Sequence, residues 1–145
     1  MLPSTVRRVP DHTDPAINRR IRSRIVRRVM YFALHPEGID ERLRELDREW
    51  DIERTLEANA ALLGLAGVAL GSAGLRGGLR LSALVTGFLL QHAVQGWCPP
   101  MPLLRRLGIR TAREIEIERV ALKALRGDFD EIGADGIRAV SAAAR

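Results

Sequence analysis

Two apolar runs without a charged residue occupy the middle of the chain. The first covers residues 58–75; the second covers residues 81–104 and closes on Gly96-Trp97-Cys98-Pro99-Pro100. Residues 58–75 and residues 81–98 are each about 18 residues long, and a helix of this length spans about 27 Å. The hydrocarbon core of a bilayer is about 30 Å thick. We therefore predict that residues 58–104 form a helical hairpin that crosses a membrane. A buried hairpin in a soluble bundle is the alternative.

The segment before the hairpin, residues 14–57, predicts two amphipathic helices of opposite charge. The first begins at Asp14-Pro15, an N-cap followed by proline in the first turn, and ends before Pro36. Arginines occupy its polar face, and its apolar stripe is Ile17, Ile21, Ile25, Val29 and Phe32. The second helix is acidic, and its stripe is Ile39, Leu43, Leu46 and Trp50. We expect the two stripes to pack together as an antiparallel pair. Docking of the basic helix on an anionic membrane or a nucleic acid is the alternative.

The first apolar run follows the acidic helix without a helix-breaking residue, which predicts one long helix from residue 40 into the hairpin. Glycines recur in this run at spacings of three, four and three, at Gly64, Gly67, Gly71 and Gly74. Small residues on one face let helices approach closely in a membrane. We expect this face to contact the second span or another copy of the chain, the alternative being a flexible segment. Gly77-Gly78 is expected to supply the unusual backbone angles of the link.

Polar side chains gather at the end of the second run. In an antiparallel hairpin they face the start of the first run, where Asn59 lies. Such groups usually hydrogen-bond to a neighbouring helix or lie at the membrane surface. The alternative is a functional pocket formed by Asn59, Gln91, His92, Gln95 and Cys98.

The two ends of the chain predict simpler structure. Residues 1–13 have no periodicity and are expected to form a flexible arm. Thr111 to Glu114 fits a capping box, so a helix is expected up to Arg126, with Gly127 as its terminator. Its inward residues would be Ile115, Leu122, Leu125 and Phe129. The fold is thus predicted to be all-α, with the hairpin at 58–104 and a C-terminal cytosolic helix and tail at 105–145.

Charge predicts the orientation of the hairpin. The chain has 23 Lys and Arg against 18 Asp and Glu, and Lys123 is the only lysine. Arginines flank both outer ends of the hairpin, whereas the link has only Arg76 and Arg80. Cytoplasmic loops carry the excess of basic residues, so both termini are expected in the cytoplasm.

Several classes of site are not favoured. The single cysteine, Cys98, excludes an intramolecular disulfide, and the arginine-rich start does not resemble a secretory signal. The histidines are scattered, so no metal site is predicted. The glycines of the link follow no strand, so no cofactor-binding loop is predicted either.

One segment resembles a known family. Gly96-x-Cys98-Pro99 and Leu107-Gly108-Ile109-x-Thr111, placed after two apolar spans, resemble the YgaP-like transmembrane domain family of small bacterial inner-membrane proteins. The resemblance covers about residues 52–111. It implies a two-helix membrane hairpin that often self-associates. Some relatives carry a sulfur-transferring rhodanese domain, for which this chain has no room, and Ala112 stands where many relatives place another cysteine.

Three functions therefore compete. The first is a non-enzymatic module of the bacterial inner membrane that self-associates or scaffolds a partner, without a cofactor. The second is a sulfur or redox relay at Cys98, which requires a reactive thiolate. The third is binding of nucleic acid or anionic lipid by the arginine-rich helix, with nucleic acid disfavoured because no reader motif accompanies it.

Overall fold

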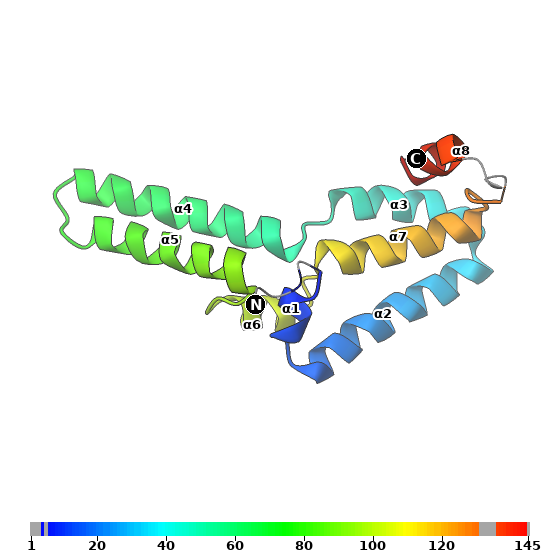
Figure 1. Cartoon of the computed structure of the whole chain (residues 1–145), viewed down its shortest axis with the longest axis horizontal. Coiled ribbons are helices and arrows are strands. Elements are labelled where there is room, and N and C mark those ends of the chain that lie inside the picture. Colours follow the sequence, from blue (N-terminus) through cyan, green and yellow to red (C-terminus); the bar gives the residue numbers. More distant parts are fainter. Residues whose placement is uncertain (1–3, 5, 131–135, 145) are drawn as a thin grey trace. The chain divides into compact units, whose positions relative to one another are not determined.

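A computed structural model describes residue 4 and residues 6–130 and 136–144 (Figure 1). The chain is 79% helical and its described residues contain no strand, so the predicted all-α class is confirmed. The elements in chain order are α1 (Arg8–Asp11), α2 (Pro15–Leu34), η1 (Pro36–Gly38), α3 (Ile39–Arg48), α4 (Ile52–Ser72), α5 (Gly78–Gln95), α6 (Met101–Leu107), α7 (Ala112–Arg126) and α8 (Gly136–Ala144).

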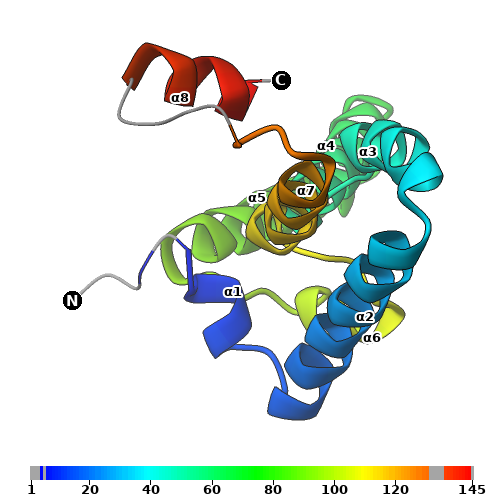
Figure 2. The same cartoon turned by 90° about the vertical axis from the view of Figure 1, so that its right-hand side faces the viewer.

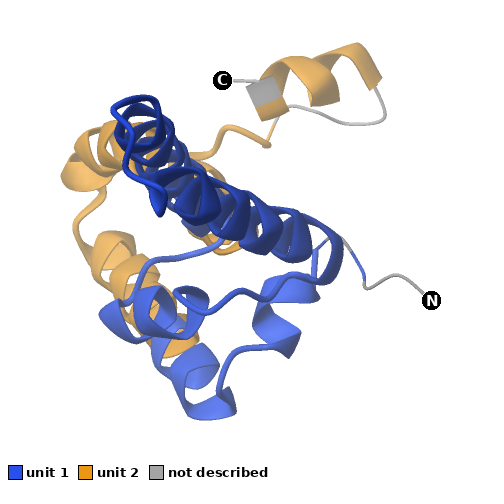
Figure 3. Ribbon diagram, turned by 90° about the vertical axis from the view of Figure 1, so that its left-hand side faces the viewer, with its two compact units in different colours: residues 1–21, 50–112 blue, residues 22–49, 113–145 orange. Residues whose placement is uncertain are grey.

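The chain divides into two compact units (Figure 3). Unit 1 comprises Met1–Ile21 and Trp50–Ala112, and it contains the hairpin of α4 and α5. Unit 2 comprises Arg22–Glu49 and Arg113–Arg145, and it contains α3, α7 and α8. Both boundaries of the predicted 58–104 segment fall inside unit 1.

The first helix of the hairpin, α4, is separate from the acidic helix α3 that precedes it. Glu49 is extended, with ψ 127°, and separates α3 from α4. The Asp51 side chain then caps α4 by accepting a hydrogen bond from the Arg54 backbone N–H at 2.7 Å. The prediction of one continuous helix from residue 40 was therefore wrong, because an aspartate cap competes effectively with helix continuation. Trp50 lies in this break and is 49% exposed, with the Arg54 guanidinium 4.4 Å above its ring, so it is not the packing residue that was expected.

The link between α4 and α5 is formed by a different glycine from the predicted ones. Gly74 has φ 87°, in the left-handed region that favours glycine, whereas Gly77 has φ −79°. The Leu75 N–H donates to the Leu70 carbonyl at 3.0 Å, and the Gly74 N–H donates to the Gly71 carbonyl at 3.1 Å. These bonds satisfy the last carbonyls of α4.

Close packing of α4 on α5 depends on glycine. A Cβ atom on Gly67 would lie 2.5 Å from Ser82 Oγ, and one on Gly71 would lie 2.8 Å from Leu79 Cγ. From the other helix, a Cβ atom on Gly78 would lie 2.3 Å from the Gly71 nitrogen. The predicted glycine face therefore contacts the second helix at Gly67 and Gly71. A Cβ atom on Gly64 would have no neighbouring atom within 4 Å, so this position is not packed against α5.

Two alanine substitutions are expected to change stability in opposite directions. Gly78→Ala places a methyl group against the backbone of α4 and should destabilise the hairpin by about 1–3 kcal/mol. Gly64→Ala meets open space and should stabilise α4 by up to about 1 kcal/mol, because alanine is the better helix former. Thermal unfolding of both variants, followed by circular dichroism in the same detergent, measures the two signs. Equal shifts for the two variants would contradict the proposed close approach of the helices.

The core of unit 1 lies at the open end of the hairpin. It contains Val9 of α1, Ile52 and Leu56 of α4, Cys98, and Met101 of α6, all 5% exposed or less. Val9 is 1% exposed and belongs to this core, and residues 8–11 form a helical turn inside the segment 1–13 that was predicted to be a flexible arm. Residues 1–3 and 5 lie outside the described residues.

The second predicted segment, residues 81–104, is not one continuous helix. The helix α5 ends at Gln95, where Gly96 adopts φ 77°. The chain then turns through the two prolines and restarts as α6. The left-handed glycine followed by Pro99-Pro100 prevents α5 from continuing, because proline lacks the N–H that a helix requires.

Unit 2 is organised around α7, which lies beside α3 and also faces the unit 2 part of α2 (Figures 1 and 2). The Glu118 side chain of α7 is 0% exposed; it accepts from Arg42 Nε of α3 at 2.8 Å and lies 3.6 Å from Arg28 of α2. The apolar cluster Ile39, Leu43, Leu46, Ile115 and Leu122 joins α3 to α7, with Phe32 packed against it.

The acidic helix α3 has a main partner, α7, that the sequence analysis did not predict, and of the predicted α2 stripe Phe32 packs against the α3–α7 cluster. The acidic helix α3 forms ion pairs with α7, through Asp40 with Arg126 and Asp47 with Arg119. The helix α7 has an apolar stripe and basic side chains of its own. Although it is distant from α3 in the sequence, it therefore provides both apolar contacts and ion-pair partners for α3. The predicted end of α7 at Arg126 is confirmed, but Leu125 is 44% exposed and does not face inward.

The hairpin surface is bare and apolar. Within the described residues, one stretch inside Pro36–Ser72 is long and apolar enough to cross a membrane, and 11% of its most apolar window is buried. Large apolar side chains that are at least 44% exposed extend along α4 and α5 and include Leu62, Leu65, Val68, Leu79, Leu84 and Leu90. Such an exposed apolar surface marks an interaction site for lipid or protein.

Candidate functional site

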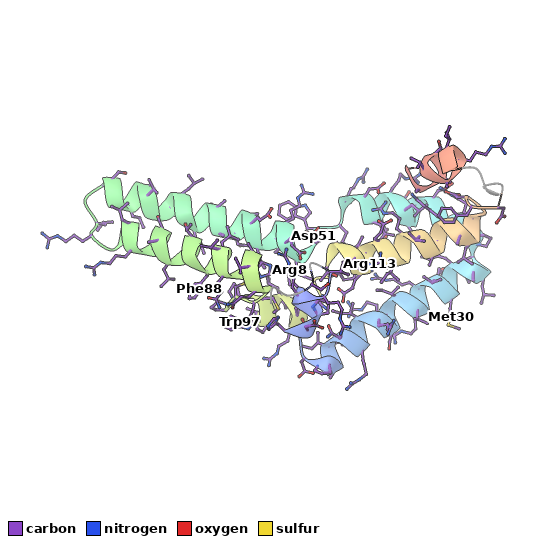
Figure 4. The ribbon with its side chains drawn as sticks, in the orientation of Figure 1. Arg8, Met30, Asp51, Phe88, Trp97 and Arg113 are labelled. Atoms are coloured by element: carbon purple, nitrogen blue, oxygen red, sulfur yellow. The ribbon has the colours of Figure 1, made fainter. Side chains whose placement is uncertain are left out.

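A cavity of about 450 Å³ lies in unit 1 beside the hairpin. Its walls come from α4, from α5 and from the turn into α6. Figure 4 labels Phe88, one of the wall residues, on α5, and Trp97 just after that helix. The cavity is lined by Leu56, Asn59, Ala60, Leu63, Leu81, Leu84, Val85, Phe88, Leu89, His92, Cys98, Pro99, Pro100 and Leu104.

His92 is the one strongly polar side chain that is buried in this wall. It is 4% exposed, and neither ring nitrogen has a hydrogen-bond partner among the described residues. Buried polar atoms in proteins are usually paired, and an unpaired one costs about 1–3 kcal/mol. The position arises because His92 is in the last turn of α5, next to the turn made by Gly96, where the chain closes over it.

The structure brings together three of the five residues of the predicted polar pocket. Asn59, His92 and Cys98 all line the cavity. Asn59 is exposed, and its amide nitrogen donates to the Thr55 carbonyl of its own helix at 2.7 Å. Gln91 and Gln95 do not line the cavity; they lie half-buried and exposed respectively on other faces of α5.

The Gly-x-Cys-Pro closure forms the end wall of the cavity. Gly96 needs its left-handed conformation, and a Cβ atom there would lie 2.5 Å from Arg8 Cβ. Cys98 is 3% exposed in the core of unit 1, and Pro99 lines the cavity beside it. A reactive thiolate requires access to its partner, which burial of Cys98 does not provide.

The sequence did not predict a buried polar network around Arg105 in unit 1. Arg105, which was counted only as a flanking basic residue, is 0% exposed. It donates to Thr13 Oγ1 at 3.2 Å, to the Ile109 carbonyl at 3.0 Å and to Asn18 Oδ1 at 3.0 Å. No local pattern distinguishes this arginine from its exposed neighbour Arg106, because its partners come from distant parts of the chain.

Arg8 and Glu53 complete this network. Arg8 donates to the Ala93 carbonyl at 2.7 Å and lies 4.0 Å from the Glu53 carboxylate. These contacts join α1 to α4 and α5.

The lining of the cavity is mostly apolar, and its buried polar or titratable side chains are His92 and Cys98. Within the described residues, no group of three or more His, Cys, Asp or Glu side chains could hold a metal ion. Comparisons with protein-family models, curated proteins and solved structures found no match to this chain.

Proposed function

We propose that the chain is an integral protein of the bacterial inner membrane whose α4–α5 hairpin crosses the bilayer twice, and that it acts as a non-enzymatic, self-associating or scaffolding module. The observation that carries the proposal is the bare hairpin. The side chains of Leu62, Leu65 and Leu79 are 67%, 70% and 62% exposed. A soluble helical hairpin buries such side chains in its core, whereas a membrane hairpin turns them toward lipid.

The proposed topology places both termini in the cytoplasm, because arginines flank the outer ends of the hairpin. Self-association is proposed through the outer side of α4, where the Cβ position of Gly64 is open and a second backbone could approach. Gly67 and Gly71 are already occupied by α5 and are not part of that surface.

Membrane fractionation with cysteine labelling in intact cells tests the location and the topology. The protein is expected in the carbonate-resistant membrane fraction. Gly77→Cys, in the exposed link, should react with a membrane-impermeant maleimide outside the cell. Arg106→Cys should react only after permeabilisation, and the buried native Cys98 should stay protected in both cases. A soluble protein, or labelling of Arg106→Cys in intact cells, would contradict the proposal.

Contact of α2 with anionic lipid is a second candidate function, and an exposed apolar stripe favours it. Val26, Met30 and Leu34 recur every fourth residue and are 50%, 65% and 80% exposed. The exposed Arg22 and Arg27 lie on the same helix. A helix that combines exposed apolar and basic residues is typical of the membrane surface.

Replacing both Arg22 and Arg27 with glutamine should weaken this contact. Each basic residue near an anionic surface contributes about 1 kcal/mol, so the loss is about 2 kcal/mol. Hydrogen exchange of the α2 amides, compared in nanodiscs with and without phosphatidylglycerol, measures it. The parent should gain protection only with the anionic lipid, and the double variant should not. Equal protection in both nanodiscs would exclude this function.

A further inference from the structure

We propose that a cleft of unit 2, between α2 and α3, binds a phosphate monoester through the guanidinium groups of Arg24, Arg27 and Arg28. The site goes beyond the proposed membrane function, because it recognises the phosphate group whether a lipid or a soluble molecule carries it. It also differs from the lipid contact proposed above for α2, which rests on an exposed apolar stripe and not on a cleft.

The lining of the cleft identifies the charge of the ligand. The cleft has a volume of about 400 Å³, which lies in the range of small-ligand sites, about 300–1,000 Å³. Four arginines line it, Arg24, Arg27 and Arg28 of α2 and Arg42 of α3, against a single carboxylate, Glu45. Such an excess of guanidinium groups attracts an anion, and the oxygens of a phosphate group match the planar fork of an arginine especially well.

The ion pairs of these arginines show which of them are available to a ligand. Arg42 donates from Nε to Glu118 at 2.8 Å and from Nη1 to Glu45 at 2.6 Å, so its position is fixed and its charge is balanced. Arg28 lies 3.6 Å from Glu118, and its side chain is 39% exposed. Arg24 is half-buried and Arg27 is exposed, and neither has a partner among the described residues. The accessible donors of the cleft therefore come from α2.

Repulsion within α2 also favours an anion in this position. The helix contains no Asp or Glu and six arginines, Arg19, Arg20, Arg22, Arg24, Arg27 and Arg28. Arg24 precedes Arg27 by three residues and Arg28 by four, and like charges at these spacings destabilise a helix. An anion bound among the three guanidinium groups offsets their repulsion, so binding should also stabilise α2.

The two unpaired guanidinium groups favour a monoester over a diester. A phosphate monoester carries close to two negative charges at pH 7, because its second pKa is about 6. It therefore matches Arg24 and Arg27 together, whereas a diester has one negative charge and would leave one of them unmatched. Tyr31 also lines the cleft, and its ring is stacked on His35 with the ring centroids 4.3 Å apart. The phenol group of Tyr31 adds a neutral hydrogen-bond donor to the lining.

Titration of the full-length protein with inorganic phosphate tests the site. The protein is placed in phosphatidylcholine nanodiscs at constant ionic strength, and the NMR signals of the arginine Nε–H groups report binding at each side chain. We expect saturable shifts for Arg24 and Arg27, and none for Arg22, which is exposed on the same helix but does not line the cleft. Dimethyl phosphate, a diester, should bind more weakly. Shifts that do not saturate, or that are equal for Arg22 and Arg24, would show general screening of charge and overturn the proposal.

Two variants separate the cleft from the total charge of the helix. Arg24→Gln and Arg22→Gln each remove one positive charge from α2, but only Arg24 lines the cleft. The affinity for inorganic phosphate should fall about 10- to 100-fold in Arg24→Gln, the range expected for loss of a hydrogen bond to a charged group. It should stay close to that of the parent in Arg22→Gln. Because Arg24 has no partner among the described residues, both variants should melt at or above the temperature of the parent. Equal affinities in the two variants would overturn the site.

The lipid composition of the nanodiscs distinguishes the two sources of the phosphate. Phosphatidic acid carries a phosphate monoester, and phosphatidylglycerol carries a diester and serves as the control for surface charge. If a lipid head group occupies the site, phosphatidic acid should raise the half-saturating concentration of inorganic phosphate for the parent more than phosphatidylglycerol does, and this difference should disappear in Arg24→Gln. Equal effects of the two lipids assign the site to soluble phosphate monoesters. Absence of phosphate binding in every nanodisc overturns the site alone, because membrane fractionation tests the location of the protein separately.

Discussion

Leu65→Arg is expected to remove most of the protein from the membrane fraction. Leu65 lies near the centre of the first apolar run and is 70% exposed on α4, so the structure offers the arginine no partner to replace lipid contact. Leucine favours the membrane centre by about 0.3–0.6 kcal/mol and arginine disfavours it by about 2.5–3.5 kcal/mol. The difference, about 3–4 kcal/mol, corresponds to roughly a 100- to 1,000-fold change in the insertion equilibrium. Carbonate extraction followed by quantitative blotting measures it.

The matched control is Ile117→Arg. Ile117 is 46% exposed on α7, outside the hairpin, so an arginine there should leave membrane insertion unchanged. The two substitutions also separate the membrane hairpin from its soluble alternative. In a soluble protein both positions would be ordinary exposed sites, where substitutions change stability by about 0.5 kcal/mol or less. Equal behaviour of the two variants would therefore contradict the membrane proposal.

Local sequence patterns predicted where the helices lie better than they predicted which helices pack against one another. The proline at position 15 and the left-handed glycine at position 127 mark helix ends that the structure confirms. The break before α4 was missed because Asp51 was treated as one more acidic residue, although its side chain caps the helix. The partner of α3 was missed for a different reason. Stripe periodicity shows that a helix has an apolar face, but it does not show which of several such faces will cover it.

The candidate site shows the same limit. Asn59, His92 and Cys98 could be grouped from the sequence because an antiparallel hairpin brings the end of its second helix beside the start of its first. Gln91 and Gln95 differ from His92 by one and three residues, and only the rotation of α5 decides which of them faces the cavity. Burial of Arg105 depends on Thr13 and Asn18, which are more than 80 residues away in the sequence, as their separations of 92 and 87 show.

Glu118→Gln is expected to be the most destabilising conservative change in unit 2. Glu118 is fully buried and accepts from Arg42, whose side chain is 11% exposed, while Arg28 lies 3.6 Å away. Burial alone would lower the pKa of Arg42, but its hydrogen bonds with Glu118 and Glu45 raise that pKa above the ordinary value. Removing the carboxylate charge leaves Arg42 buried without its main counter-charge. Breaking a buried pair from one side costs about 3–5 kcal/mol.

Hydrogen exchange of the full-length protein measures this loss where it occurs. Amides of α3 and α7 should exchange roughly 100- to 4,000-fold faster in Glu118→Gln, because the opening free energy falls by about 3–5 kcal/mol. Glu116→Gln is the matched control: this carboxylate is 47% exposed and pairs with Arg119 on its own helix, so its loss should cost about 1 kcal/mol or less. Replacing both partners, as Arg42→Met with Glu118→Leu, should restore much of the protection, since apolar side chains of similar size can take the place of a buried pair. If Glu118→Gln and Glu116→Gln exchange at the same rate, the buried carboxylate does not hold α3 against α7.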